Sequence, residues 1–203
     1  MIENVKASGK REVDVRWRYF SLTQVNSKQG GAPKTGSAGL GAPRGDVPSQ
    51  QEGWTVWDAP ETEEVRGRLS FKAAEAARRQ HKFDEFHMPM LRAKHRDNLD
   101  IEDVAVVERV AVESGLDLER FRKDVADPQI IHALARDHQH AVSEHGVFGT
   151  PTLVFPGGAA VYVRLSELVE GDEAVRLFDE VISIASTEPH ILEIKRPTKP
   201  ARD

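Results

Sequence analysis

The stretch Gly146-Val147-Phe148-Gly149-Thr150-Pro151-Thr152, continued by Leu153-Val154-Phe155, contains the signals that decide the fold. Its first glycine is typical of a residue that ends a helix. A Thr-Pro bond follows, and the apolar residues after it are typical of a short buried strand. The segment therefore predicts a helix that ends at Gly146, a proline-containing loop, and a strand that starts after Pro151.

Composition limits the classes of protein to which the chain belongs. Its 203 residues suffice for one core, or for one core with a helical subdomain. The net charge of −5 argues against nucleic-acid binding, which needs a basic face. No apolar run has the length of a membrane span, and the polar first ten residues lack the apolar stretch of a signal peptide. We therefore expect a cytoplasmic protein. Because cysteine is absent, disulfides and thiolate chemistry are excluded in this chain.

The N-terminal part predicts a short helix, a strand and a long loop. Residues 2–8 are typical of the end of a helix. In residues 12–21 apolar and polar side chains alternate, which predicts a strand with one buried face at the edge of a sheet. Glycine, proline, serine and alanine dominate residues 27–51, as in a mobile loop or a lid.

The middle of the chain is predicted to be helical, because apolar residues recur at spacings of three and four. Three tracts show this spacing: residues 65–77, 83–90 and 104–111. Asp117 would cap a short helix around Phe121.

The remaining signals predict a long helix, a hairpin and a last helix. The long helix would start at Asp127-Pro128 and end at Gly146. Two apolar runs flank Pro156-Gly157-Gly158 and predict a β-hairpin. Asp172 would cap the last helix, and the proline-containing residues 188–203 predict an extended tail.

Three stretches of the sequence carry a resemblance to a known family: Val13-Asp14-Val15-Arg16-Trp17-Arg18-Tyr19-Phe20-Ser21-Leu22 with Asn26, Ala73 to Arg79 with Gln80, and Gly146 to Phe155. Together they resemble the DsbA family of thioredoxin-like proteins, particularly its branch related to 2-hydroxychromene-2-carboxylate isomerases. The resemblance covers about residues 1–187 and implies an α/β thioredoxin-like fold with an inserted α-helical subdomain. The division that it implies is a thioredoxin-like part in 1–22 and 146–187, a loop in 23–60, a helical insertion in 61–145 and a tail in 188–203.

The resemblance also implies a binding site. In the family, the proline of this loop is cis, and the backbone beside it pairs with an extended substrate peptide. It therefore predicts a cis Thr150-Pro151 bond and substrate binding at Gly149, Thr150 and Pro151. The partner expected there is a peptide, or a small thiol or aromatic substrate. The alternative interpretation is an ordinary trans proline that opens a strand.

The chain departs from the family's pattern at its beginning. Family members have a strand and a Cys-x-x-Cys motif before the helix that corresponds to residues 2–8, and neither is present here. Because the missing strand would be central in the sheet, we expect that the chain folds poorly alone or that its start codon lies upstream of Met1. A homodimer would be a third way to supply the missing strand pairing.

Three functions stay open at this level. The first is a DsbA-like thiol-disulfide oxidoreductase, inactive as written because it has no cysteine. The second is an isomerase or glutathione-transferase-like enzyme of the same fold, and the third is a non-catalytic binding protein. No catalytic residue and no cofactor is predicted in this chain.

Histidines and tryptophans are the remaining candidates for functional side chains. His138, His140 and His145 lie on one predicted helix, but residues two apart point in different directions and no carboxylate completes a metal-binding spacing. We therefore predict no metal site, and we expect these histidines to be solvated or to lie at a helix end. Trp54 and Trp57 are predicted to anchor the preceding loop on the domain surface.

Overall fold

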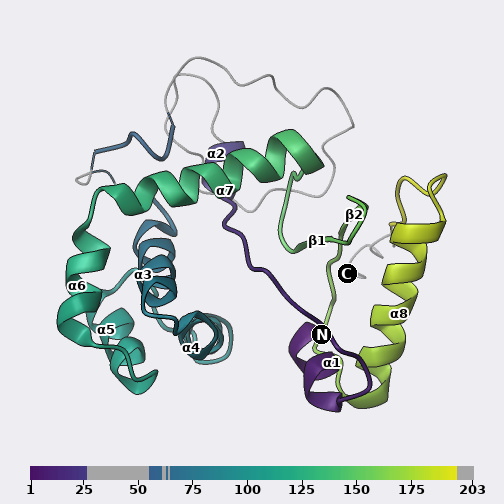
Figure 1. Cartoon of the computed structure of the whole chain (residues 1–203), viewed down its shortest axis with the longest axis horizontal. Coiled ribbons are helices and arrows are strands. Elements are labelled where there is room, and N and C mark those ends of the chain that lie inside the picture. Colours follow the sequence, from purple (N-terminus) through teal and green to yellow (C-terminus); the bar gives the residue numbers. More distant parts are fainter. Residues whose placement is uncertain (27–54, 61–62, 64, 196–203) are drawn as a thin grey trace, which may run out of the picture. The chain divides into compact units, whose positions relative to one another are not determined.

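The structure is a computed structural model that describes residues 1–26, 55–60, 63 and 65–195. The described part is mostly helical and contains a small two-stranded sheet (Figure 1). In chain order the elements are α1 (Ile2–Ser8), α2 (Leu22–Asn26), α3 (Arg68–Arg79), α4 (Phe83–His95), α5 (Val104–Glu113), α6 (Leu118–Ala126), α7 (Gln129–His145), β1 (Thr152–Val154), β2 (Ala160–Tyr162) and α8 (Gly171–Thr187). The predicted loop of residues 27–51 and Trp54 lie outside the described residues.

The chain divides into two compact units. Residues 1–17 and 149–203 form one, here called the terminal unit, and residues 18–148 form the other, here called the helical unit. The first contains α1, β1, β2 and α8, and the second contains α2 to α7.

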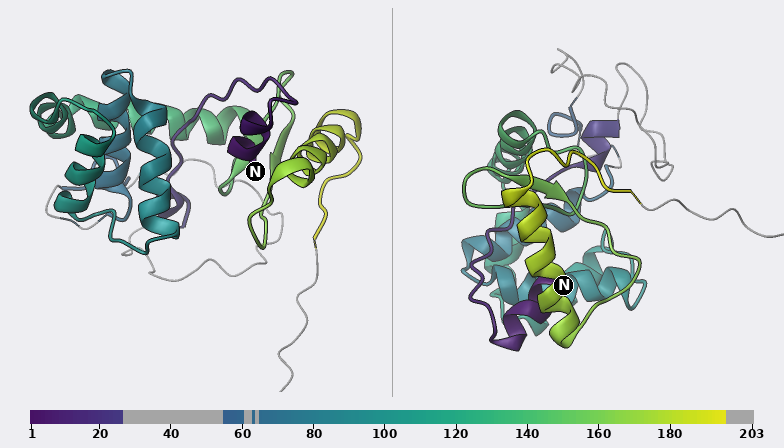
Figure 2. Two further views of the ribbon diagram at one scale, coloured as in Figure 1. Left: turned by 90° about the horizontal axis from the view of Figure 1, so that it is seen from below. Right: turned by 90° about the vertical axis from the view of Figure 1, so that its right-hand side faces the viewer.

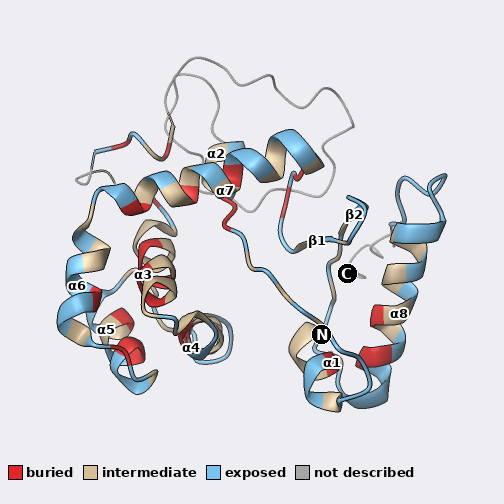
Figure 3. Cartoon of the chain, in the orientation of Figure 1, coloured by how far each residue is buried: buried red, intermediate tan, exposed pale blue. Residues whose placement is uncertain are grey.

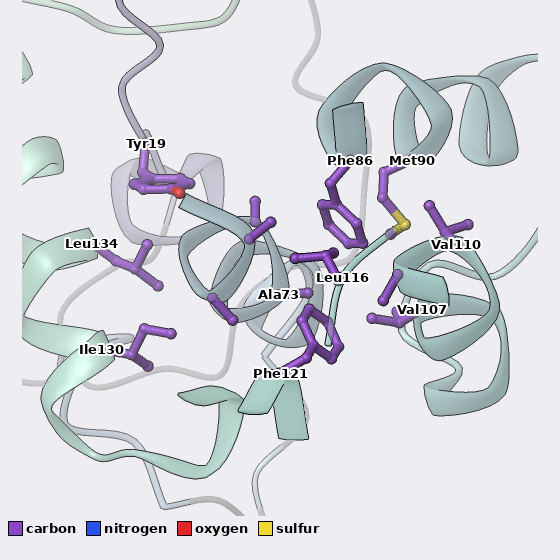
Figure 4. Close-up of a cluster of buried hydrophobic side chains, with 14 residues drawn as sticks. Tyr19, Ala73, Phe86, Met90, Val107, Val110, Leu116, Phe121, Ile130 and Leu134 are labelled. Carbon is purple, nitrogen blue, oxygen red and sulfur yellow. The ribbon is translucent and has the colours of Figure 1, made fainter. Parts of the chain in front are cut away.

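The helical unit is built around α3, which contacts α4, α5, α6 and α7. Ala73, Ala76 and Ala77 of α3 are fully buried, and their small side chains allow the neighbouring helices to approach closely. Figure 4 shows larger side chains, among them Phe86 and Phe121, pointing into the same cluster. The buried faces of these helices therefore meet in one apolar core (Figure 3).

Local sequence signals set several helix ends in this unit, as predicted. The Asp117 carboxylate accepts a hydrogen bond from the backbone N–H of Arg120 at 2.8 Å and caps α6. Asp127 Oδ1 accepts from the N–H of Gln129, the first residue of α7, at 2.9 Å. At the other end of α7, Gly146 has a φ of 59°, a left-handed conformation that glycine adopts without strain.

The terminal unit has a much smaller core, in which Val5, Ala174 and Phe178 are buried. The helix α1 lies beside α8, as both views of Figure 2 show. The strands β1 and β2 form an antiparallel hairpin in which Thr152 is opposite Tyr162. The sequence predicted a hairpin around Pro156-Gly157-Gly158, and these residues lie between the two strands.

The prediction of a strand in residues 12–21 is wrong. The structure describes all of these residues, and none of them belongs to a strand. The alternation itself is present, because Val13 and Val15 are partly buried whereas Asp14 and Arg16 are exposed. A strand also needs a neighbouring strand to accept and donate its backbone hydrogen bonds, and this segment has none among the described residues. As a result, the described sheet contains β1 and β2 alone and not the larger sheet of the predicted α/β fold.

The predicted cap of α8 is also wrong. The helix begins at Gly171, and Asp172 lies inside its first turn, where its carboxylate forms an ion pair with Lys10. An acidic residue is favourable in a first turn as well as at an N-cap, so the sequence did not distinguish the two positions.

Candidate functional site

The loop between α7 and β1 contains the three residues predicted to bind substrate. The Thr150-Pro151 peptide bond is cis, which confirms the prediction. Thr150 and Pro151 are exposed, whereas Gly149 is buried. The outer part of the loop is therefore accessible to a binding partner, and its first residue belongs to the packed interior of the terminal unit.

Two hydrogen bonds connect this loop to the hairpin. Thr152 Oγ1 donates to the carbonyl oxygen of Gly149 at 2.7 Å, and the backbone N–H of Val163 donates to the carbonyl oxygen of Pro151 at 3.1 Å. A Cβ atom at position 149 would lie 3.3 Å from the Tyr162 ring, closer than most real contacts. The close approach of the backbone to this ring favours glycine at position 149.

Backbone polar groups remain open along the loop and the adjoining strand. Within the described residues, the N–H and C=O of Thr150 have no hydrogen-bond partner. Thr152 and Val154 form the pairs of the hairpin that are not joined by hydrogen bonds, so their N–H and C=O groups point away from β2. An extended chain can bind such groups as an added strand.

His138 is buried, contrary to the expectation of a solvated or helix-end histidine. Its side chain is only 7% exposed, because it continues the apolar stripe of Ile130 and Leu134 on α7. Its Nδ1 accepts a hydrogen bond from the backbone N–H of Ser21 at 3.2 Å. Burial lowers the pKa of His138 below the ordinary 6.5. The spacing of four from Leu134 was the sequence signal for this position.

Two further histidines of α7, His140 and His145, lie near its C-terminal end and are exposed or partly exposed. The rings of His140 and His145 approach each other to 5.2 Å between centroids. No group of three or more histidine, cysteine, aspartate or glutamate side chains suited to a metal ion occurs among the residues that the structure describes.

A polar cluster connects the start of the helical unit to α3 and α7. Asp137 accepts from Arg18 Nη1 at 2.8 Å and from the backbone N–H of Tyr19 at 3.2 Å. The Tyr19 hydroxyl donates to Glu75 at 3.0 Å, and the Arg78 guanidinium lies 4.8 Å from the centre of the Tyr19 ring. Burial raises the pKa of Tyr19 above its ordinary value, so its hydroxyl keeps its proton and remains a donor.

Comparison with protein families gives the class of the protein. The family described as the DSBA-like thioredoxin domain matches residues 2–182, a range that includes the loop at Thr150-Pro151. The chain belongs to this family. No curated protein matches the chain. Among the described helices, none is both long and apolar enough to cross a membrane.

Family membership does not bring thiol chemistry to this chain. Disulfide exchange proceeds by attack of a thiolate on a disulfide sulfur, and the chain contains no cysteine to supply it. Hence thiol-disulfide activity has no support in this polypeptide, whereas the loop with its open backbone groups is present.

Proposed function

We propose that this DSBA-like protein binds an extended polypeptide at Gly149, Thr150 and Pro151 and carries out no disulfide exchange by itself. The observation that supports the proposal is the open N–H and C=O pair of Thr150, exposed and flanked by carbonyls that are already bonded within the hairpin. One donor and one acceptor on the same residue suit an added strand.

In this proposal the thioredoxin-like part, predicted in residues 1–22 and 146–187, contains most of the terminal unit, and the helical insertion predicted in residues 61–145 lies within the helical unit.

The test uses a polypeptide that is unfolded and has blocked thiols, namely reduced and carboxymethylated α-lactalbumin. We expect its addition to shift the backbone amide NMR signals of Gly149, Thr150 and Thr152 in a saturable way. Signals of α5, which belongs to the helical unit, serve as the internal reference. Saturable binding that leaves the three loop amides unchanged would refute the proposed site, and no binding at all would refute the function.

Two threonine variants separate the role of the loop's backbone from that of its side chains. Thr152→Val removes the hydroxyl that donates to Gly149, so the loop loses a restraint and binding should weaken severalfold. Thr150→Val is the matched control, because it keeps the backbone groups that the proposal uses. Equal loss in the two variants would contradict a backbone-mediated site.

Two further assays address the enzymatic alternatives. Reduction of insulin by dithiothreitol should proceed at the uncatalysed rate in the presence of this protein, since it has no thiol. Reduced glutathione is the probe for an enzyme that handles a small thiol. Saturable shifts of the loop amides with glutathione, at concentrations where the polypeptide gives none, would favour that alternative.

A further inference from the structure

His138 lies where two separate stretches of the helical unit meet α7. Its ring centroid is 4.8 Å from that of Phe20 and 5.6 Å from that of Trp57. Its Nδ1 accepts the backbone N–H of Ser21 at 3.2 Å. One buried imidazole thus contacts residues on both sides of the undescribed range 27–54 in the sequence.

The two stretches are also bonded to each other. The backbone N–H of Val56 donates to Gln24 Oε1 at 2.8 Å, and the N–H of Gln24 donates to Ser21 Oγ at 3.1 Å. Together with the contacts of His138 to Ser21 and Trp57, these bonds form a closed ring of interactions, here called the His138 clasp.

The clasp requires a neutral imidazole. Nδ1 can accept the Ser21 N–H only when it carries no proton, whereas in the imidazolium both ring nitrogens are donors. Protonation would therefore point two donors at each other in a place that is more than nine-tenths buried.

Nearby charges give the imidazolium little compensation. Ionisable side chains on the elements around His138 are Arg18, Asp58, Arg66, Arg68, Lys72, Glu75, Arg78 and Arg79, together with His132, Arg136, Asp137, His140, Glu144 and His145 of α7 itself. The adjacent acid, Asp137, already accepts from Arg18 and from the Tyr19 N–H. Asp58 accepts from the Thr55 hydroxyl at 2.5 Å. Cationic groups outnumber acidic ones in this set, so a further positive charge is not favoured.

We propose that His138 is a pH-dependent clasp: its protonation releases residues 20–24 and 56–57 from α7 while the rest of the helical unit stays folded. Burial holds the pKa of His138 below 6.5 in the closed state, whereas an open, solvated state has the ordinary value. The open state binds more protons than the closed state. The stability of the closed state relative to the open state is therefore at its full value above about pH 6.5 and decreases as the pH falls below it. The equilibrium constant for opening should rise by up to about tenfold per pH unit.

The test is amide hydrogen exchange of Ser21 and Val56, corrected for the intrinsic pH dependence of exchange. In the natural protein, the corrected opening constant should rise by up to about tenfold per pH unit below about 6.5. That of Val110, in the core of the same unit, should stay constant. In His138→Asn the amide oxygen can take the place of Nδ1 but does not titrate, so the rise should disappear. His132→Asn, an exposed histidine on the same helix, is the matched control and should behave like the natural protein.

A rise that persists in His138→Asn, or that occurs equally at Val110, would overturn the proposal. If His138→Asn fails to fold, the test uses two measurements on the natural protein. The NMR titration midpoint of His138 must then coincide with the midpoint of the loss of Ser21 protection. Midpoints that differ by more than about one pH unit, a tenfold difference in proton affinity, would also overturn it.

Discussion

The helical and the terminal unit differ in how much apolar surface they bury. In the described residues, the main cluster of the helical unit contains fourteen buried side chains, whereas that of the terminal unit contains Val5, Ala174 and Phe178. The loop with the open backbone groups lies in the terminal unit. The part of the molecule that presents the candidate site is therefore the part with the smaller core, and it has less packing to hold that site in place.

The largest expected difference between the units comes from removing one phenylalanine from each core. Phe121 is 2% exposed and packs against Phe86 with 5.8 Å between ring centroids, so Phe121→Ala should lower the free energy of unfolding by about 3–5 kcal/mol. Phe178→Ala should cost less, because few buried neighbours surround it. Urea unfolding, monitored by the hydrogen exchange of amides in each unit, measures the loss of stability in both variants.

The control for this pair is Leu168→Ala, an exposed position in the terminal unit, which should change the free energy of unfolding by less than about 0.5 kcal/mol. A loss at Phe178 equal to or larger than that at Phe121 would contradict the comparison, since it would mean that the small cluster carries as much stability as the large one.

The second prediction concerns the backbone N–H groups at the N-terminus of α3, in the helical unit. The N-terminus of α3 has no cap of its own, and Glu102 accepts hydrogen bonds from the N–H of Leu69 at 3.1 Å and from the Ser70 hydroxyl at 2.9 Å. Glu102→Ala should cost about 1–2 kcal/mol, the usual loss for a helix cap. Glu113→Ala, exposed on α5, is the control, and a thermal melt that shifts equally in both variants would refute the capping role.

Sequence signals that act locally predicted local structure well. The cap at Asp117, the end of α7 at Gly146 and the hairpin around Gly157 each depend on residues a few positions apart. Residues 12–21 failed as a strand because the missing element is a neighbouring strand, which no pattern within the segment can supply. Family membership, in turn, depended on several stretches taken together.

The candidate site was predictable only in part, for the same reason. The position of the Thr150-Pro151 loop follows from a local motif, and its cis bond followed from the family resemblance. The hydrogen bond from Thr152 to Gly149 and the approach of the Tyr162 ring depend on the folded hairpin. The burial of His138 also required tertiary contacts, because its pairing with Ser21 spans 117 residues.

The third prediction, with a smaller effect, concerns the hydrogen bond by which the Thr152 hydroxyl restrains the loop of the terminal unit. Thr152→Val replaces a hydroxyl that donates to Gly149 at 2.7 Å with a methyl group, and it should lower the stability of this unit by about 1 kcal/mol. Thr150→Val, whose side chain is exposed, should leave stability within about 0.5 kcal/mol of the natural protein. Hydrogen exchange of the hairpin amides is the measurement, and equal losses in the two variants would show that the hydroxyl does not restrain the loop.

The smallest effect concerns charge at the surface of the helical unit. The pKa of Asp127 is lowered below the ordinary 3.8, first by the backbone N–H of Gln129 and then by Arg79, whose Nη1 lies 2.7 Å from Oδ2. The carboxylate therefore stabilises the fold above about pH 3.8, and this contribution is lost as the pH falls through the lowered pKa. Asp127→Asn should be slightly less stable at pH 7, and its stability should converge with that of the natural protein under acid.

Arg79→Ala separates the two causes of this lowered pKa. The Gln129 N–H still bonds the carboxylate in that variant, so the pH dependence assigned to Asp127 should shrink but not vanish. Urea unfolding between pH 2 and 7 gives the three curves. The free energies of unfolding of the natural protein and of Asp127→Asn could instead differ as much in acid as at pH 7. In that case the charge of Asp127 does not cause the difference, and the greater stability expected of the helical unit depends on its buried core alone.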